Sequence, residues 1–399
     1  MKLQDRFLKY VKYDTQSSEN SDTFPSTLKQ HLLGEELVNE LKTLGIENAF
    51  KDDYGYVYAY LKGNKPKTIA LIAHLDTALE VSGANVKPQV IEQYDGLDIK
   101  LNDNVSINVK DFPFIKDFKG DTLITTDGTT LLGADDKAGI AIIMTLVDEL
   151  INGNVEHPSL WIVFTPDEEV GNGALHFNYD LVNVDFAYTI DGGPINSISY
   201  ENFNAASAYI RINGVSIHPG DSKNKMINSI MVAKEFDNML PINMRPEYTD
   251  KYDGFNHLMD IKGSVSLTEM AYIIRNHDAK LFEKQKETFK NIAKYLNDKY
   301  GENTVVLELR DSYKNMKDLI LPHPEIIELP KKAISYCGYT PESEPIRGGT
   351  DGARLTYEGV LCPNLGTGSY NHHGPKEFAN INEMETMVKI LKTMFSELM

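Results

Sequence analysis

Three consecutive acidic residues, Asp167, Glu168 and Glu169, follow a strongly apolar run at 160–164. That run is typical of a buried strand in a parallel sheet. A carboxylate at the end of a buried strand is costly unless a counter-charge or a metal ion pairs with it. Adjacent strand residues point to opposite sides, so Glu168 and Glu169 can serve separate purposes, one binding a metal and the other moving a proton. Taken alone, an acidic surface loop explains the stretch equally well.

Metal-ligand residue types also stand at the ends of two other apolar runs. His74 and Asp76 follow the run at 68–73, and Asp191 follows the run at 186–190. His74 and Asp76 share one face of an extended strand, and a carboxylate beside a metal-bound imidazole takes its second ring proton and sets its tautomer. For an isolated His-x-Asp pair, a hydrogen-bonded core histidine is the better explanation. The recurrence at several strand ends, where α/β sheets form their sites, favours a functional site.

Two further segments supply the same residue types. Asp135 and Asp136 open a predicted helix whose apolar face follows in the sequence. A helix N-cap accounts for one aspartate but not for both. The alternative is that Asp135 bridges two metal ions with its two oxygens. Late in the chain, His372 and His373 follow a glycine-rich turn and add two more candidate ligands.

These residue types suffice for a pair of zinc sites. The five candidate ligands are His74, Asp135, Glu169, Asp191 and one late histidine. With Asp135 shared, they divide into two sets of three, and three protein ligands plus an open position is the catalytic zinc pattern. Two zinc ions about 3.5–4 Å apart hold a hydroxide between them. Glu168 then serves as the general base, which takes a proton from the bridging water and passes it to the leaving amine.

Composition restricts the partners and the location. The 399 residues exceed one ordinary core and predict two domains. The formal net charge of −18 disfavours nucleic acids and anionic membranes, since both need a basic surface.

Cys337 and Cys362 lack zinc-ligand spacing and are expected to be buried thiols in a reducing compartment. The N-terminal residues carry no signal-peptide core, and no run approaches the roughly 18 apolar residues of a membrane helix. We therefore expect a cytoplasmic protein.

The order of predicted elements indicates an α/β fold with an insertion. A mixed sheet flanked by helices is expected over 1–203 and 313–399, which together form the catalytic domain. Between them, the patterns predict strands at 205–213, 262–267, 270–275 and 304–310, and helices at 226–240 and 278–301. The succession β-α-β-β-α-β is the ferredoxin-like motif. Residues 204–312 are therefore predicted to form an inserted α+β lid domain, a four-stranded sheet covered on one face by two helices.

Three basic residues are candidates for holding a substrate. His218 lies in a rigid His-Pro-Gly turn, and Arg275 ends a predicted strand. Arg347 lies in a glycine-rich turn before a helix, which suits bringing backbone N–H groups near an anion. A surface histidine and a solvated arginine are the simpler explanations unless the inserted domain covers the site.

Eight short motifs occur in order along essentially the whole chain: HLDT, LLGADDKAG, TPDEEVG, TIDGG, IHPG, IIR, IRGGTDGA and YNHHG. Their order and approximate spacing resemble the M20 family of metallopeptidases. The resemblance implies a zinc-dependent aminopeptidase that releases the N-terminal residue of tripeptides. Other M20-type activities, namely dipeptidase, carboxypeptidase or N-acyl-amino-acid deacylase, are the closest alternatives, and a non-catalytic peptide-binding protein is a remote one. The inserted domain resembles a lid and dimerisation domain, so a homodimer is one option for the assembly.

The resemblance also assigns roles to individual residues. It implies that His74 and Asp191 bind the first zinc, that Glu169 and His373 bind the second, and that Asp135 bridges the two. Asp76 would orient His74, and Glu168 would accept the proton. His373 is preferred over His372 because it directly precedes Gly374.

Further roles that the resemblance implies concern the backbone and the substrate. The bond between Asp135 and Asp136 is expected to be cis. His218 would hold the substrate carbonyl or oxyanion, and Arg275 and Arg347 are candidates for its carboxylate.

Overall fold

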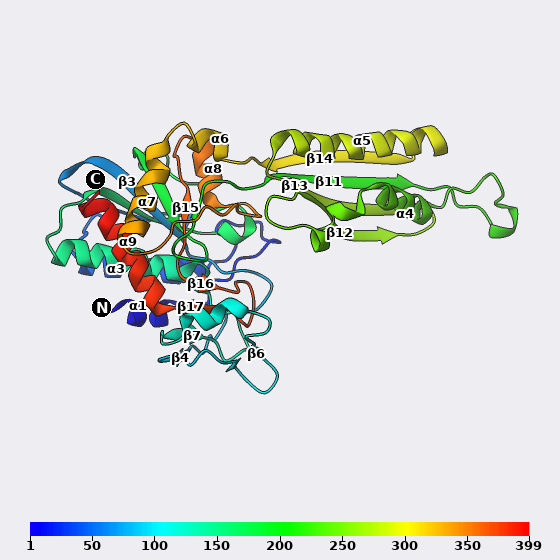
Figure 1. The fold of residues 1–399 in the computed structure, drawn as a ribbon. Coiled ribbons are helices and arrows are strands. Elements are labelled where there is room, and N and C mark those ends of the chain that lie inside the picture. The colour runs from blue at the N-terminus through cyan, green and yellow to red at the C-terminus, as the bar shows by residue number, and fades with distance from the viewer. Residues whose placement is uncertain (399) are drawn as a thin grey trace. The chain divides into compact units, whose positions relative to one another are not determined.

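The computed structural model describes residues 1–398, which form two compact units (Figure 1). The first unit comprises Met1–Tyr200, Asp318–Glu344 and the chain from Thr350 onward, and the second comprises Glu201–Lys317 and Pro345–Gly349. The segment Pro345–Gly349 thus packs with the second unit, whereas the sequence-based boundaries group it with the catalytic part. The roles of catalytic domain and lid stay predictions for the two units.

A mixed seven-stranded sheet forms the centre of the first unit. Its order is β1-β2-β8-β3-β9-β15-β10. The strands are β1 (Phe50–Lys51), β2 (Val57–Leu61), β3 (Lys65–His74), β8 (Pro158–Thr165), β9 (Phe186–Ile190), β10 (Ile198–Ser199) and β15 (Asn364–Leu365). Strand β3 runs parallel to β8 and β9, while β2 is antiparallel to β8. The apolar runs form the central strands because both faces of the sheet are covered.

Helices of the first unit cover mainly one face of this sheet. They are α1 (Leu3–Tyr10), α2 (Gln30–Thr43), α3 (Ala134–Asn152), α7 (Pro324–Tyr336), α8 (Asp351–Tyr357) and α9 (Ile381–Ser396). Helices α3 and α9 lie side by side and share the largest apolar core with α1, α2, α7 and the central strands (Figure 1). Helix α8 belongs to a smaller core on the other face. The short α6 (Lys317–Ile320) lies where the chain passes from the second unit back to the first.

Residues 80–130 contribute to a smaller sheet. Four strands in the order β16-β17-β7-β4 form it, and β5 and β6 pair separately. Their bounds are β4 (Gln89–Ile91), β5 (Ile99–Lys100), β6 (Ser106–Ile107), β7 (Leu123–Thr125), β16 (Ser369–Tyr370) and β17 (Phe378–Asn380). The pairing of β17 with β7 joins the late part of the chain to the segment that leads into α3.

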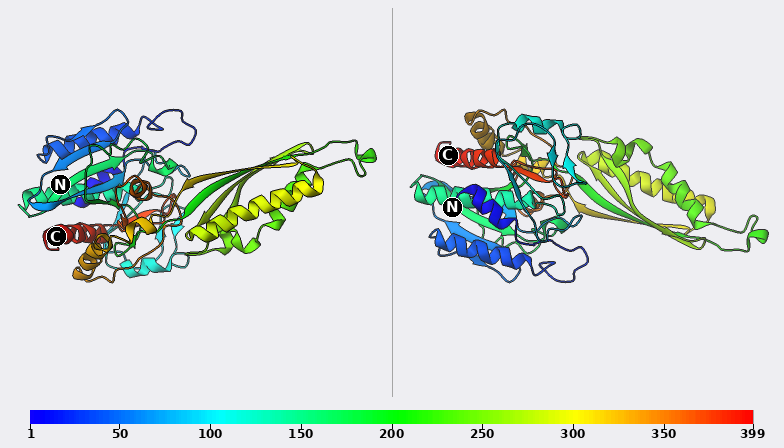
Figure 2. Two further views of the ribbon diagram at one scale, coloured as in Figure 1. Left: turned by 90° about the horizontal axis from the view of Figure 1, so that it is seen from above. Right: turned by 90° about the horizontal axis from the view of Figure 1, so that it is seen from below.

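The second unit is an antiparallel sheet with two helices on one face (Figure 2). In chain order its elements are β11 (Asn204–Asn213), α4 (Ser229–Met239), β12 (Phe255–Gly263), β13 (Leu267–Asn276), α5 (Ala279–Tyr300) and β14 (Val305–Tyr313). The sheet order is β12-β13-β11-β14. Asp278 begins α5 by accepting a hydrogen bond from Leu281 N, as an N-cap residue does. The succession β-α-β-β-α-β agrees with the sequence-based prediction.

Strand β12 begins seven residues before its predicted start, at Phe255 and not at Lys262. It is an edge strand, and a register shift between Leu258 and Asp260 interrupts its alternation. A bulge of this kind breaks the period of two that reveals a strand. Within residues 1–398, no helix is long and apolar enough to cross a membrane.

Candidate metal centre

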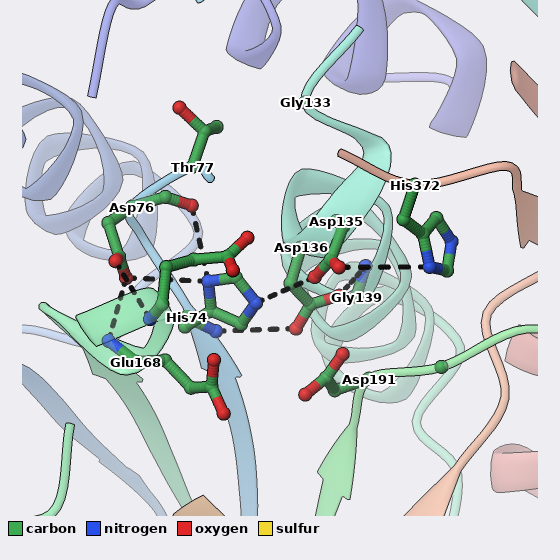
Figure 3. Close-up of polar contacts among 12 residues, drawn as sticks. His74, Asp76, Thr77, Gly133, Asp135, Asp136, Gly139, Glu168, Asp191 and His372 are labelled. Atoms are coloured by element: carbon green, nitrogen blue, oxygen red, sulfur yellow. Dashed lines mark hydrogen bonds and ion pairs between the residues drawn. The ribbon is translucent and has the colours of Figure 1, made fainter. Parts of the chain in front are cut away.

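The candidate ligands come together because β3, β8 and β9 are parallel neighbours. In their register, His74 at the end of β3 pairs with Thr165 at the end of β8, and Ile72 pairs with Thr189 in β9. The residues that follow these strands therefore meet at one edge of the sheet. Figure 3 shows the side chains of Asp135, Glu168 and Asp191 extending toward the same region as the His74 ring.

The two nitrogens of His74 have different partners (Figure 3). Its Nε2 lies 2.8 Å from Asp135 Oδ1, while its Nδ1 lies 3.1 Å from the carbonyl oxygen of Asp76 and 3.4 Å from Asp76 Oδ1. The ring is buried. A proton on Nδ1 satisfies the acceptors of Asp76, which leaves Nε2 to face the carboxylates.

Asp76 holds the acidic turn as well as the imidazole. Its Oδ1 accepts a hydrogen bond from Glu168 N at 3.0 Å, and its Oδ2 accepts one from Glu169 N at 3.1 Å. The side chain is completely buried. Asp76 thus contacts the His74 ring through its carbonyl oxygen and Oδ1, and its carboxylate fixes the backbone of both glutamates. Residue spacing does not reveal this second task, because every residue has a backbone donor.

Asp135 and Asp136 enter the site at the beginning of α3, and the peptide bond between them is cis, as expected. Gly133 precedes them with a left-handed φ of 76°. The buried Asp136 accepts hydrogen bonds from His74 N (3.3 Å) and Gly139 N (3.1 Å). Gly139 lies against β9, where a Cβ atom would stand 1.9 Å from the carbonyl oxygen of Ile190. Asp136, which the sequence suggested at most as a helix cap, thus ties α3 to β3.

Both late histidines lie beside Asp135, but in different ways. Nε2 of His373 lies 3.1 Å from Glu169 Oε2 and 3.4 Å from Asp135 Oδ2. Nε2 of His372 contacts Ser369 Oγ at 2.8 Å, and its Nδ1 lies 3.7 Å from Asp135 Oδ2. His373 therefore has a ring nitrogen between two candidate ligand carboxylates, whereas one nitrogen of His372 is taken by a serine.

Two groups of side chains have ligand atoms close enough to hold a cation. His74, Asp135 and Glu169 form one, and His74, Asp136 and Asp191 form the other, with the atoms of each group within 4.8 Å of one another. In addition, Glu169 Oε1 is buried and has no hydrogen-bond partner among residues 1–398. A buried carboxylate oxygen left alone is costly, and a cation would satisfy it. The donor set of imidazole nitrogen and carboxylate oxygen fits zinc.

The electrostatics of the site are those of crowded, buried acids. Burial raises the pKa of Glu169 to about 7 and that of Asp191 to about 6, and it raises the pKa of Glu168 well above its usual range. The neighbouring carboxylates of Asp135 and Glu169 raise the pKa of His373 to about 11. Burial also acts to raise the pKa of Asp135, but His373 and His74 hold it well below its usual range. Such a site attracts positive charge, either as protons or as a metal ion.

Asp167, the first acid of the triplet, points away to a different partner. Its buried carboxylate accepts hydrogen bonds from Ser26 N and Ser26 Oγ, both at 2.5 Å, and from Gln30 Nε2 at 2.6 Å. Its backbone has a left-handed φ of 57°. Asp167 therefore anchors the turn that presents Glu168 and Glu169 to the segment before α2.

The three candidate substrate residues all belong to the second unit. His218 is exposed, with Asp221 Oδ2 3.9 Å from its Nδ1. Arg275 donates to two main-chain carbonyls and lies over the ring of Tyr313. Arg347 donates to the carbonyls of Lys251 and Asp253 and to Thr249 Oγ1. Their substrate-binding roles stay predictions.

Comparisons with known proteins identify the family of this chain and show solved structures with a similar fold. The family model "Peptidase family M20/M25/M40" matches residues 121–397. A protein named peptidase T from Halothermothrix orenii is 52% identical over 397 residues, covering 98% of this chain and 97% of its own. The crystal structure of aminopeptidase PepT from Bacillus cereus has a TM-score of 0.78 at 20% identity, with 99% of this chain and 98% of that chain covered. A tripeptidase from Staphylococcus aureus has a TM-score of 0.78 at 19% identity, with 99% and 97% covered. The chain belongs to peptidase family M20/M25/M40.

Proposed function

We propose that the protein is a two-zinc aminopeptidase that releases the N-terminal residue of tripeptides, with Glu168 as its general base. The observation that carries this proposal is the placement of Asp135 between two histidines. Its Oδ1 lies 2.8 Å from His74 Nε2, and its Oδ2 lies 3.4 Å from His373 Nε2. A carboxylate whose two oxygens face different imidazoles is suited to bridging two metal ions.

The remaining ligands divide around this bridge. Asp191 is assigned with His74, because the candidate group that holds both lacks Glu169, although Glu169 also shares a group with His74 and Asp135. Glu169 belongs with His373, whose Nε2 lies 3.1 Å from Glu169 Oε2. This division leaves His372 outside the ligand set. The ions would supply Lewis-acid activation of water and of the scissile carbonyl.

The protein's own residues then handle the protons and the orientation. Glu168 takes a proton from the attacking water and gives it to the leaving amine. Burial raises the pKa of this carboxyl well above its usual range, which favours the protonated form that gives the proton to the leaving amine. Asp76 keeps the His74 ring in place through its carbonyl oxygen and Oδ1, and its carboxylate holds the backbone of Glu168, so one residue fixes the base and a metal ligand.

The tripeptide preference rests on relatives. The sequence relative is named peptidase T, and one structurally similar protein is named a tripeptidase. His218 is proposed to hold the substrate carbonyl or oxyanion, and Arg275 and Arg347 its carboxylate. A cytoplasmic location and a homodimer are part of the same proposal.

Hydrolysis of matched peptides tests this function. We expect the zinc-loaded protein to cleave a free tripeptide at its first bond and to leave its N-acetylated form intact. Removal of metal with a chelator should abolish cleavage, and zinc should restore it. Equal cleavage of the blocked peptide would refute the aminopeptidase assignment and favour a deacylase. Tight peptide binding without chelator-sensitive turnover would favour a binding protein.

A further inference from the structure

One buried carboxylate near the candidate metal centre takes no part in the proposed chemistry. Glu377 lies four residues after His373 and directly before β17. Its side chain is only 1% exposed. A buried carboxylate needs strong partners, because its charged form loses the solvation that water would give it.

The partners of Glu377 are all backbone donors of one turn. Oε2 accepts hydrogen bonds from Leu132 N at 2.7 Å and Gly133 N at 2.8 Å, and Oε1 accepts one from Asp135 N at 3.0 Å. Hydrogen bonds from N–H groups to a carboxylate are about twice as strong as neutral ones. The left-handed conformation of Gly133, with φ at 76°, belongs to the turn that presents these donors.

This turn carries Asp135, and the segment that carries Glu377 also carries His373. The two segments are more than 240 residues apart in the sequence. Glu377 thus joins the backbone of the proposed bridging ligand to the segment of one proposed zinc ligand. We propose that Glu377 is a positioning residue that sets Asp135 against His373 and so fixes the spacing of the two metal ions; this inference rests on the proposed two-zinc site.

The alternative is that Glu377 only stabilises the fold. The two explanations differ in what happens to metal binding in protein that is still folded. A positioning residue controls affinity, because misplaced ligands bind less well; loss of a hydrogen-bond partner behind a metal ligand typically weakens metal binding by about 10- to 100-fold. A residue that only stabilises the fold changes the melting temperature and leaves the affinity of the folded protein unchanged.

The test compares Glu377→Gln and Glu377→Leu with a matched control. Glutamine has the same shape but only one carbonyl oxygen, so it keeps part of the contacts, and leucine keeps none. The control is Glu383→Gln, which removes a half-buried carboxylate of the same region, one that accepts from the Tyr370 hydroxyl at 2.7 Å. Zinc affinity is measured by competition with a chelating dye, at a temperature where circular dichroism shows each protein to be folded.

We expect Glu377→Leu to bind zinc about 10- to 100-fold more weakly than the wild type, with both ions affected because Asp135 contacts both sites. Glu377→Gln should fall between the wild type and the leucine variant, and Glu383→Gln should stay within about twofold of the wild type. If Glu377→Leu does not fold, the isosteric Glu377→Gln decides the matter.

The inference is overturned if a folded Glu377 variant binds zinc with wild-type affinity. It is also overturned if the Glu383→Gln control loses as much zinc affinity as the Glu377 variants. Failure of the proposed function has a different signature. A wild-type protein that binds two zinc ions but does not cleave tripeptides contradicts the function and leaves the positioning role of Glu377 intact. A wild-type protein that binds no zinc contradicts both.

Discussion

Replacement of Asp167 tests how the turn that carries Glu168 and Glu169 is held. The Asp167 side chain is 1% exposed and accepts three hydrogen bonds, two from Ser26 and one from Gln30. The variant Asp167→Ala removes all three acceptor contacts at once. The Ser26 hydroxyl can rotate toward another acceptor, so two N–H groups lose their acceptor: that of the Ser26 backbone and one of the Gln30 amide, whose nitrogen also donates to Thr27 Oγ1 at 3.4 Å.

The expected loss of stability follows from these two donors. Each buried donor left unsatisfied costs about 1–3 kcal/mol, so the pair costs about 2–6 kcal/mol. Part of this is offset, because burial raises the pKa of Asp167 and the alanine variant no longer buries that carboxylate. We therefore expect Asp167→Ala to lower the free energy of unfolding of the first unit by about 2–4 kcal/mol. Asp167→Asn keeps one acceptor oxygen and should lose about half as much.

The chain offers a convenient probe for this measurement. It contains a single tryptophan, Trp161, which lies in β8, the strand that leads into the acidic turn. Its fluorescence during urea titration therefore reports the unfolding of the first unit. The control is Asp278→Ala, which removes the N-cap of α5 in the second unit at a cost of about 1 kcal/mol and should leave the Trp161 transition unchanged. The anchoring role is refuted if the free energy of unfolding that Trp161 reports for Asp167→Ala lies within about 0.5 kcal/mol of the wild-type value.

Three further predictions concern the metal centre directly. Glu168→Gln should keep both metal ions and lose about 10²- to 10⁴-fold in turnover; a near-normal rate would mean that another group is the base. Asp135→Ala should reduce zinc per chain at both sites, measured by atomic emission, and loss of one ion only would contradict a bridge. The metal-free protein should melt at a higher temperature at pH 5.5 than at pH 8. Burial raises the folded-state pKa of Glu169 to about 7 and of Asp191 to about 6, above the unfolded values of about 4. Their stabilising contribution is therefore complete below about pH 4 and is lost as the pH rises through 6–7. Calorimetry with a chelator checks this prediction, zinc should remove the effect, and a melting temperature that rises from pH 5.5 to 8 would refute it.

The convergence of His74, Asp135, Glu169 and Asp191 could be predicted from the sequence for a physical reason. Each follows or opens a strongly apolar segment, and parallel strands bring their ends to one edge of a sheet. The β-α-β-β-α-β succession of the second unit was predictable because its strands and helices have distinct periods of apolar residues. These features depend on side-chain type and spacing, which a sequence displays directly.

The backbone contacts that hold the site in place could not be predicted in this way. The carboxylates of Asp76 and Glu377 accept hydrogen bonds from backbone N–H groups, and Asp167 is bound partly by the backbone of Ser26. A backbone donor has no sequence signature, so a motif search sees the acid but not its partner. The leucines of residues 26–44 also recur at helical spacing, but α2 begins only at Gln30, and Leu28 lies outside the helix and is 73% exposed.

The close contact of α3 with β9 limits how this protein can be altered. At Gly139 a Cβ atom would lie 1.9 Å from the carbonyl oxygen of Ile190, so main chain meets main chain there with no side chain between. The distance between the segments that carry Asp135 and Asp191 is thus set by backbone atoms, and substitutions elsewhere on α3 do not change these atoms. Directed evolution can vary exposed side chains farther along this helix, such as Glu149, and keep the ligand spacing. Position 139 itself admits glycine alone.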